Sequence, residues 1–220
     1  ARDLRSFTAD VVYETKSGLL GDSVLRTGRV VYRNPLPGSG GADRDKALAI
    51  RFDAIIENRR KRERTTEYVF AGRWLVEKDA EQKLFIKREV APPGQTFDPF
   101  KLGEGPIPLP IGQPAAEVLK RFTVTTTAVP TDGRLAKLAA RGGVDGIGLV
   151  PKAGTKAAED IARVDHFYDR MTNLPVGVIV VETNEDTKIA RLDDLKRNVE
   201  LDDATLELLS VEAPNEPGWT

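Results

Sequence analysis

The chain has 220 residues, with 33 basic and 34 acidic side chains and a formal net charge of −1, a balance that gives no reason to expect a nucleic-acid partner. It contains no cysteine, which excludes disulfides, thiolate chemistry and cysteine-ligated zinc. No stretch approaches the roughly 20 apolar residues that a membrane-spanning helix needs.

The first half of the chain alternates apolar and polar residues, which is the pattern of half-buried strands. Because the links are too short for crossover helices, we predict a meander of about six antiparallel strands. Gly28, inside the second of them, predicts a bulge or a close approach of two strands. The expected strands are residues 7–14, 24–33, 47–56, 64–70, 74–79 and 83–90.

The middle of the chain differs. Residues 97–112 place four prolines among large apolar side chains, and prolines this dense forbid a helix interior or a central strand. A short helix follows, because Ala115, Val118, Leu119 and Phe122 form one apolar stripe with helical spacing. A second helical turn is expected over residues 134–141, ended by two glycines.

The last third returns to strands, expected over residues 146–152, 161–168, 176–182 and 188–199, with a tight turn at Asp145–Gly146 and a short helix within residues 201–209. We therefore predict an α+β, mainly β fold: an incomplete, half antiparallel β-barrel with a lid of helices and loop over its concave face. Residues 1–220 are expected to form a single domain, with an N-terminal meander (1–91), a helical and proline-rich lid (92–142) and C-terminal strands (143–220).

The sequence contains few candidate catalytic residues. His166 is the only histidine, so a catalytic triad would have to use it as the base. Gly21-Asp22-Ser23 is similar to the nucleophile block of the SGNH-type esterases, which alternate helices with parallel strands as this chain does not. We predict no enzyme, no cofactor and no metal site, and keep a Ser23/His166 hydrolase as a remote alternative.

Residues 57–64 form the strongest local charge cluster, with five basic and two acidic side chains. One interpretation is a solvated hairpin edge whose charges discourage aggregation. The other is a docking surface for an acidic partner or a lipid headgroup. The candidate docking residues are Arg59, Arg60, Lys61, Arg62 and Arg64.

An apolar cover that is not hydrogen-bonded into the sheet can shift and open a dry slot for an acyl chain, which gains about 0.8 kcal/mol per buried methylene. The alternative is that lid and sheet pack into a solid core. The candidate ligand-binding residues are Val11, Tyr13, Leu48, Ile50, Phe52, Tyr68, Phe70, Leu84, Ile86, Phe97, Phe100, Ile107, Leu109, Ile111, Val118, Leu119 and Phe122.

Five passages together resemble one known family. They are SFTADVVYET (6–15), GRVVYRNP (28–35), YVFAGRWLVEKDAEQKLFI (68–86), LVPK (149–152) and DDATLELLSVEAPNEPGW (202–219). Their order along nearly the whole chain resembles the LolA-type periplasmic carriers of outer-membrane lipoproteins, of which this would be a divergent member.

This resemblance implies a hydrophobic cavity for lipoprotein acyl chains and no covalent chemistry. It also implies a periplasmic location with the signal peptide removed, and handover from an inner-membrane ABC transporter to an outer-membrane receptor. We therefore expect a monomeric carrier that binds lipoprotein acyl chains, or another lipid, and ferries lipoproteins towards the outer membrane. The alternative is a periplasmic apolar-ligand sensor or protein-interaction domain on the same scaffold, docking through residues 57–64.

Overall fold

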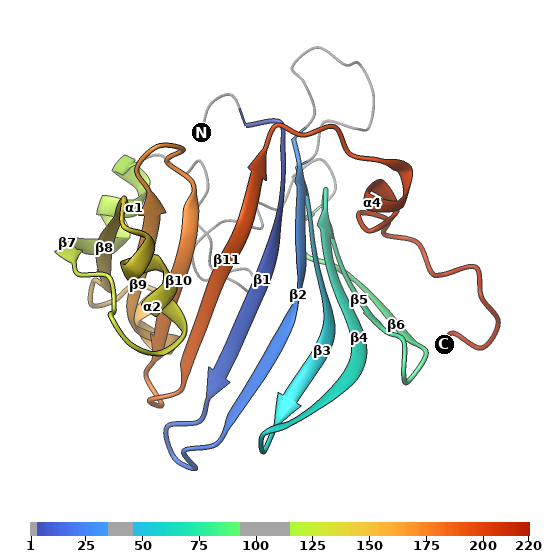
Figure 1. Ribbon diagram of the computed structural model, residues 1–220, viewed down its shortest axis with the longest axis horizontal. Coiled ribbons are helices and arrows are strands. Elements are labelled where there is room, and N and C mark those ends of the chain that lie inside the picture. The colour runs from blue at the N-terminus through green and yellow to red at the C-terminus, as the bar shows by residue number, and fades with distance from the viewer. Residues whose placement is uncertain (1–3, 35–45, 93–114) are drawn as a thin grey trace. The chain divides into compact units, whose positions relative to one another are not determined.

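The described part of the chain is dominated by one antiparallel sheet. The computed structural model describes residues 4–34, 46–92 and 115–220. These contain an 11-stranded sheet with the order β6-β5-β4-β3-β2-β1-β11-β10-β9-β8-β7, accompanied by short helices (Figure 1). Because β6 and β7 are its two edges, the sheet is not closed. The expected fold class, mainly β with an incomplete antiparallel sheet, is confirmed.

The meander predicted for the first half is also confirmed, since each of its strands lies beside the next one in sequence. One boundary differs. The fourth strand begins at Arg60 rather than Arg64, because the turn before it is only Asn58–Arg59. The strands are β1 (Ser6–Lys16), β2 (Ser23–Arg33), β3 (Ala47–Glu57), β4 (Arg60–Ala71), β5 (Trp74–Asp79) and β6 (Leu84–Glu89).

The second half also follows the expected order, and its predicted hairpin is formed by β10 and β11. Two details of the prediction were wrong. Phe122 starts strand β7 instead of ending a helix, because the sequence FTVTTT is rich in β-branched residues. Asp145–Gly146 lies inside β8 and is not a turn. The strands are β7 (Phe122–Thr127), β8 (Val144–Pro151), β9 (Ile161–Asp169), β10 (Pro175–Glu182) and β11 (Thr187–Arg197).

The helices are short. The expected ones near residues 115, 134 and 203 are present, and the first ends at Arg121, directly before the strand that Phe122 begins. The helices are α1 (Ala115–Arg121), the 3₁₀ turn η2 (Gly133–Leu135), α2 (Ala136–Arg141), α3 (Ala157–Asp160) and α4 (Asp203–Glu207).

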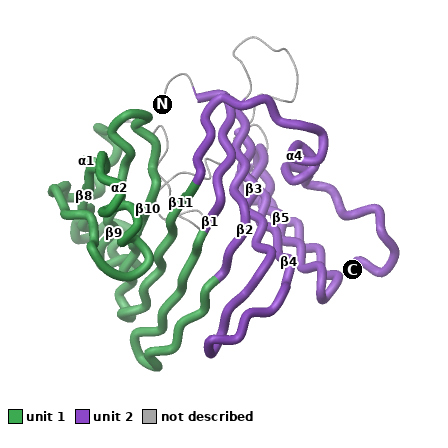
Figure 2. The backbone as a smooth tube through the Cα atoms, viewed as in Figure 1, with its two compact units in different colours: residues 1–2, 12–25, 100–193 green, residues 3–11, 26–99, 194–220 purple. Residues whose placement is uncertain are grey.

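The chain divides into two compact units that interleave in sequence (Figure 2). Within the described ranges, the first unit holds residues 12–25 and 115–193. The second holds residues 4–11, 26–34, 46–92 and 194–220.

In the first unit, the η2 turn and helix α2 close a small core against β9 and β10. Leu135 and Leu138 pack with Phe167 and Val176. A Cβ at Gly177 would lie 2.8 Å from the Leu138 Cδ1 atom, so a larger residue there would force the Leu138 side chain to shift. The helix ends at Gly142, whose φ of 71° requires a glycine-like residue.

In the second unit, α4 and the residues after it cover one face of the strands. Leu209 packs against Val31, Val69 and Val76. The Asp202 side chain caps α4 by accepting a 2.8 Å hydrogen bond from the Thr205 amide. The short terminal helix is thus held by both a cap and an apolar contact.

Gly28 fulfils the prediction of a close approach. An added Cβ would lie 1.9 Å from the Arg51 carbonyl oxygen and 2.7 Å from the Phe52 Cα atom. Any side chain at this position would therefore push β2 away from β3.

Candidate functional site

The strand register places the predicted ligand-binding residues of β3 to β6 on one face of the second unit. Adjacent partners on neighbouring strands share a face of a sheet. One row is Leu48–Phe70–Leu75–Arg88, the next is Ile50–Tyr68–Glu77–Ile86, and the third is Phe52–Thr66–Asp79–Leu84. This face is therefore apolar in its first row up to Arg88 on the edge strand β6, and it carries two polar residues in each of the other rows.

Helix α4 lies on the opposite face. Between the first two rows, Val69 pairs with Ala49 on β3 and with Val76 on β5, so these three side chains point to the other face of the sheet. They contact the segment that contains α4. Since α4 covers that face, it is not a lid over the predicted ligand-binding residues.

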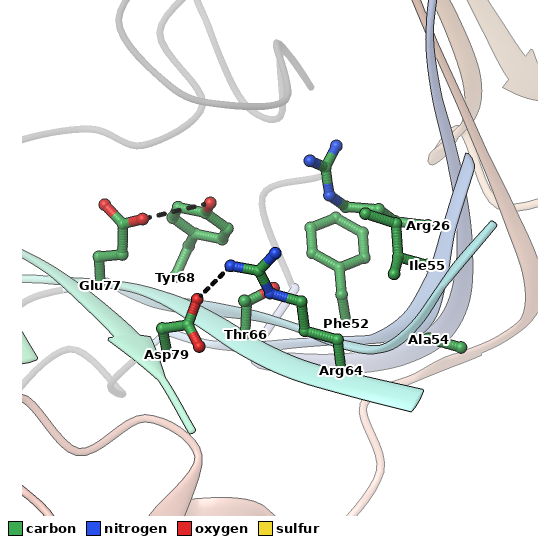
Figure 3. Close-up of a pocket in the computed structure, with 9 residues that line it drawn as sticks. All are labelled: Arg26, Phe52, Ala54, Ile55, Arg64, Thr66, Tyr68, Glu77 and Asp79. Atoms are coloured by element: carbon green, nitrogen blue, oxygen red, sulfur yellow. Dashed lines mark hydrogen bonds and ion pairs between the residues drawn. The ribbon is translucent and has the colours of Figure 1, made fainter. Parts of the chain in front are cut away.

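A pocket opens where the apolar and polar rows meet (Figure 3). Figure 3 shows Phe52, Arg26 and Arg64 pointing into the same space. All of its lining residues belong to the second unit. They are Arg26, Phe52, Ala54, Ile55, Arg64, Thr66, Tyr68, Glu77 and Asp79.

A β-bulge in β4 forms one wall of this pocket. Phe52 pairs with Thr66 and Ala54 pairs with Glu63, so Arg64 and Thr65 both oppose the single residue Asp53. A bulge changes the direction of the side chains at its position. The structure thus separates Arg64 from the other basic residues of the 57–64 cluster and places it in the pocket.

Arg64 is held there by a charge pair. Its Nη2 atom lies 2.6 Å from the Asp79 Oδ2 atom. Burial alone would raise the pKa of Asp79, but hydrogen bonds from Arg64 and from the Gln82 and Glu81 amides outweigh it, so the pKa of Asp79 is lowered. The hydrogen bond to Asp79 in turn raises the pKa of Arg64.

The Arg64 Nε atom is buried and has no hydrogen bond among the described residues, although it lies 3.5 Å from a Glu81 carboxylate oxygen. At that distance, and without the geometry of a hydrogen bond, the contact between Arg64 and Glu81 is weak. One donor of Arg64 is therefore left poorly satisfied.

On the other side of the pocket, the Tyr68 hydroxyl donates a long 3.5 Å hydrogen bond to Glu77. Burial, and then the negative charge of Glu77, raise the pKa of Tyr68, so its hydroxyl stays protonated. The Arg26 guanidinium forms no ion pair with any residue that the structure describes. Arg26 is thus a cation in a pocket, available to a negatively charged group.

The pocket volume is about 90 Å³, below the roughly 300–1,000 Å³ of a pocket for a drug-sized ligand. It has room for a headgroup or one end of a chain. No cluster of His, Asp and Glu that could hold a metal ion occurs in the described part of the chain. The pocket offers a cation, Arg26, and a polar wall beside the ring of Phe52.

The other predicted ligand-binding residues lie elsewhere. Val11 is buried in β1 of the second unit. Tyr13, Val118, Leu119 and Phe122 belong to the first unit, where Phe122 is fully buried and Leu119 is 52% exposed. Phe97, Phe100, Ile107, Leu109 and Ile111 lie outside the described residues.

His166 is buried in β9, and neither ring nitrogen has a hydrogen-bond partner among the described residues. Burial lowers its pKa to about 3, so the ring is neutral. Ser23 is exposed at the start of β2. The hydrogen bond between serine and histidine that a hydrolase would need is therefore not formed.

Sequence reasoning missed the polar half of the pocket: Arg26, Glu77 and Asp79. The signal was present, because Glu77 and Asp79 alternate with Val76 and Lys78 and so share a face with Leu75. Charged residues at inward positions of a strand indicate a polar site inside an apolar face.

Separately, no helix in the described ranges is both long and apolar enough to cross a membrane.

Comparison with known proteins finds similarity to solved structures only. No protein-family model matches the sequence, and no curated protein matches it significantly. A conserved protein of Thermus thermophilus is similar to the chain with a TM-score of 0.48 and 9% identity, over 97% of this chain and 88% of that one. A LolA superfamily protein of Nitrosomonas europaea is similar with a TM-score of 0.34 and 9% identity, over 92% and 90% of the two chains.

A third similar structure is the complex of MucA and MucB from Pseudomonas aeruginosa, with a TM-score of 0.45 and 12% identity. The match covers 93% of this chain but only 55% of that one, so the chain spans about half its length. The family that the sequence resembles is thus represented among the similar structures. Likenesses of this strength carry no argument about function.

Proposed function

We propose that residues 1–220 act as one domain that binds the acyl chain of a lipoprotein or another lipid, and that it is a periplasmic carrier of the LolA type. The observation that carries the proposal is the strand register of the second unit. It brings Leu48, Ile50, Phe52 and Phe70 to one face, next to a pocket lined by Arg26, which has no ion pair among the described residues.

Large apolar side chains and polar groups lie side by side on this face, which suits an amphiphile. Apolar burial supplies about 25 cal/mol per Å² of surface removed from water and is non-directional, so it selects for a fatty chain without regard to its identity. Polar groups at the end of an apolar surface fix the orientation of a ligand. The apolar rows would take the chain, and the pocket beside Phe52 and Arg26 would take its polar end.

Handover follows from the same proposal. A carrier of this type would receive its cargo from an inner-membrane ABC transporter and release it to an outer-membrane receptor. Neither step needs covalent chemistry, and His166, buried with its pKa lowered to about 3, is a weak base.

Native mass spectrometry of the protein purified from its own host tests the proposal, because a carrier should retain lipid or lipopeptide. Displacement of an environment-sensitive fluorescent fatty acid measures the affinity. Ile86 and Phe85 are half-buried neighbours in β6 whose side chains point to opposite faces. We expect Ile86→Gln to weaken binding about tenfold through lost apolar contact.

Phe85→Gln is the matched control, because Phe85 packs on the α4 side and its replacement should leave binding intact. Phe52→Glu should abolish binding while circular dichroism shows that the fold persists. If neither native nor added lipid binds, or if the two β6 variants lose affinity equally, the proposed binding face is wrong.

A second candidate function is favoured by the small pocket volume of about 90 Å³. A sensor or protein-interaction domain on the same scaffold needs to recognise one end of a ligand and does not need to enclose a long chain. Transfer assays separate the two, because a carrier moves labelled lipid from donor to acceptor vesicles whereas a sensor binds it without accelerating transfer.

A further inference from the structure

The β3–β4 hairpin ends in four consecutive basic residues, Arg59, Arg60, Lys61 and Arg62, called here the basic tip. We propose that the basic tip docks the protein on an anionic lipid surface. This goes beyond the proposed function, because it requires no ligand in the pocket.

All four side chains of the basic tip are exposed. Arg62 lies 3.6 Å from a Glu57 carboxylate oxygen, and such surface pairs contribute little. The other three form no ion pair with any residue that the structure describes. The tip therefore presents cations that the described protein does not neutralise.

The turn that carries the tip has an unusual residue. Asn58 and Arg59 have φ values of 50° and 61°, as in a two-residue type I′ turn, and this turn strongly favours Asn-Gly. An arginine in the left-handed region carries a conformational cost that glycine avoids. Arg59 is one of seven described non-glycine residues with a positive φ, and its place at the end of the hairpin leaves its side chain exposed.

The arrangement of the cations favours a lipid surface over an acidic peptide. Successive side chains of a strand point to opposite faces, so Arg60, Lys61 and Arg62 project from both sides of the hairpin. None of them lines the pocket. Cations on both sides of a narrow ribbon can all reach a broad anionic plane, whereas a peptide bound on one side meets only half of them.

Docking would also position the candidate site. Arg64, which lines the pocket, follows Arg60 by four residues in the same strand, about 13 Å at 3.3 Å per residue. The bulge at Arg64 turns that arginine towards Asp79, whereas the four cations of the basic tip stay exposed. A docked tip would therefore hold the pocket close to the lipid surface.

Co-sedimentation with vesicles tests the proposal. We expect the full chain to sediment with phosphatidylcholine vesicles that contain phosphatidylglycerol, and not with phosphatidylcholine alone. Each cation removed from the tip by Arg60→Gln, Lys61→Gln or Arg62→Gln should weaken binding about fivefold, and salt should abolish it.

Arg88→Gln is the charge-matched control. Arg88 is exposed, has no ion pair among the described residues, and lies beside Leu75 near the β4–β5 turn, at the other end of β4 from the tip. Its replacement should leave vesicle binding within about twofold of the wild type, because the change lies beyond a Debye length from the tip.

Arg59→Gly gives a readout that a purely structural role would not produce. It should raise the thermal midpoint by relieving the turn and at the same time weaken vesicle binding about fivefold. The proposal is overturned if the triple tip variant sediments like the wild type, if Arg88→Gln loses as much, or if polyglutamate binds the tip more tightly than the vesicles do.

Discussion

The carboxylate of Asp79 accepts a 2.6 Å hydrogen bond from Arg64 and two 3.1 Å hydrogen bonds from the amides of Glu81 and Gln82. One side chain therefore joins the bulged strand β4 to the turn that leads into β6. The Asp79 side chain is only 8% exposed, so its charge depends on these three donors.

Replacing Arg64 by methionine should destabilise the fold by about 1–3 kcal/mol at neutral pH, because a buried carboxylate loses its charged partner. The pKa of Asp79 is lowered in the folded state, so the pair stabilises the fold above the unfolded pKa of about 3.9 and the effect is lost as pH falls through the folded pKa. Urea unfolding should therefore show the difference between wild type and Arg64→Met shrinking in acid. A difference that is constant with pH would contradict this.

Replacing His166 by leucine should remove a pH dependence. The folded pKa is about 3 and the unfolded value about 6.5, so the unfolded state binds the proton and stability falls as pH drops from about 6.5 towards 3. At about pH 5 the free energy of unfolding of the wild type is therefore about 2 kcal/mol lower than at alkaline pH. The free energy of unfolding of His166→Leu should not show this loss. If the variant and the wild type lose the same free energy of unfolding between about pH 6.5 and pH 3, the lowered pKa of His166 is refuted.

Gly28→Ala should destabilise the second unit by about 1–3 kcal/mol, because the new methyl group would lie 1.9 Å from the Arg51 carbonyl oxygen. Gly21→Ala is the control. Gly21 has a φ of 69° but no atom within 4 Å of an added Cβ, so it costs only the backbone strain of about 1 kcal/mol. The denaturant midpoints of the two variants measure the loss of stability. If Gly28→Ala loses less stability than Gly21→Ala, β2 and β3 can move apart without cost.

Arg26→Gln should reduce affinity for a fatty acid about tenfold and leave affinity for the fatty alcohol of the same length unchanged. The reason is that Arg26 offers the pocket a cation with no ion-pair partner among the described residues, and a charge-assisted hydrogen bond contributes about 1.5–3 kcal/mol. Fluorescent-ligand displacement with both compounds measures the difference. Equal losses for the two ligands would show that Arg26 acts on the fold and not on the headgroup.

The strands of β1 to β6 could be predicted from sequence because alternation of apolar and polar residues is a local signal. Strand β7 could not, because Phe122 completes an apolar helical stripe with Val118 and Leu119 while the threonines after it favour a strand. The local pattern was ambiguous there, and pairing with β8 decided it.

The apolar part of the candidate site was also predictable, since Phe52 and Tyr68 follow from the same alternation. Its polar part required long-range information. The pairing of Arg64 with Asp79 depends on a bulge, and the presence of Arg26 in the pocket depends on how β2 meets β3 at Gly28. Neither relationship is visible in a single stretch of sequence.

The strand order puts β1, the first of the described strands, between β2 and β11, the last of them in sequence. During synthesis one edge of β1 must therefore stay unpaired until residues 187–197 have left the ribosome. Contacts between such distant parts of a chain slow folding, and an open strand edge invites pairing with other chains. The nascent protein accordingly has a long interval in which a chaperone that shields β1 would raise its yield.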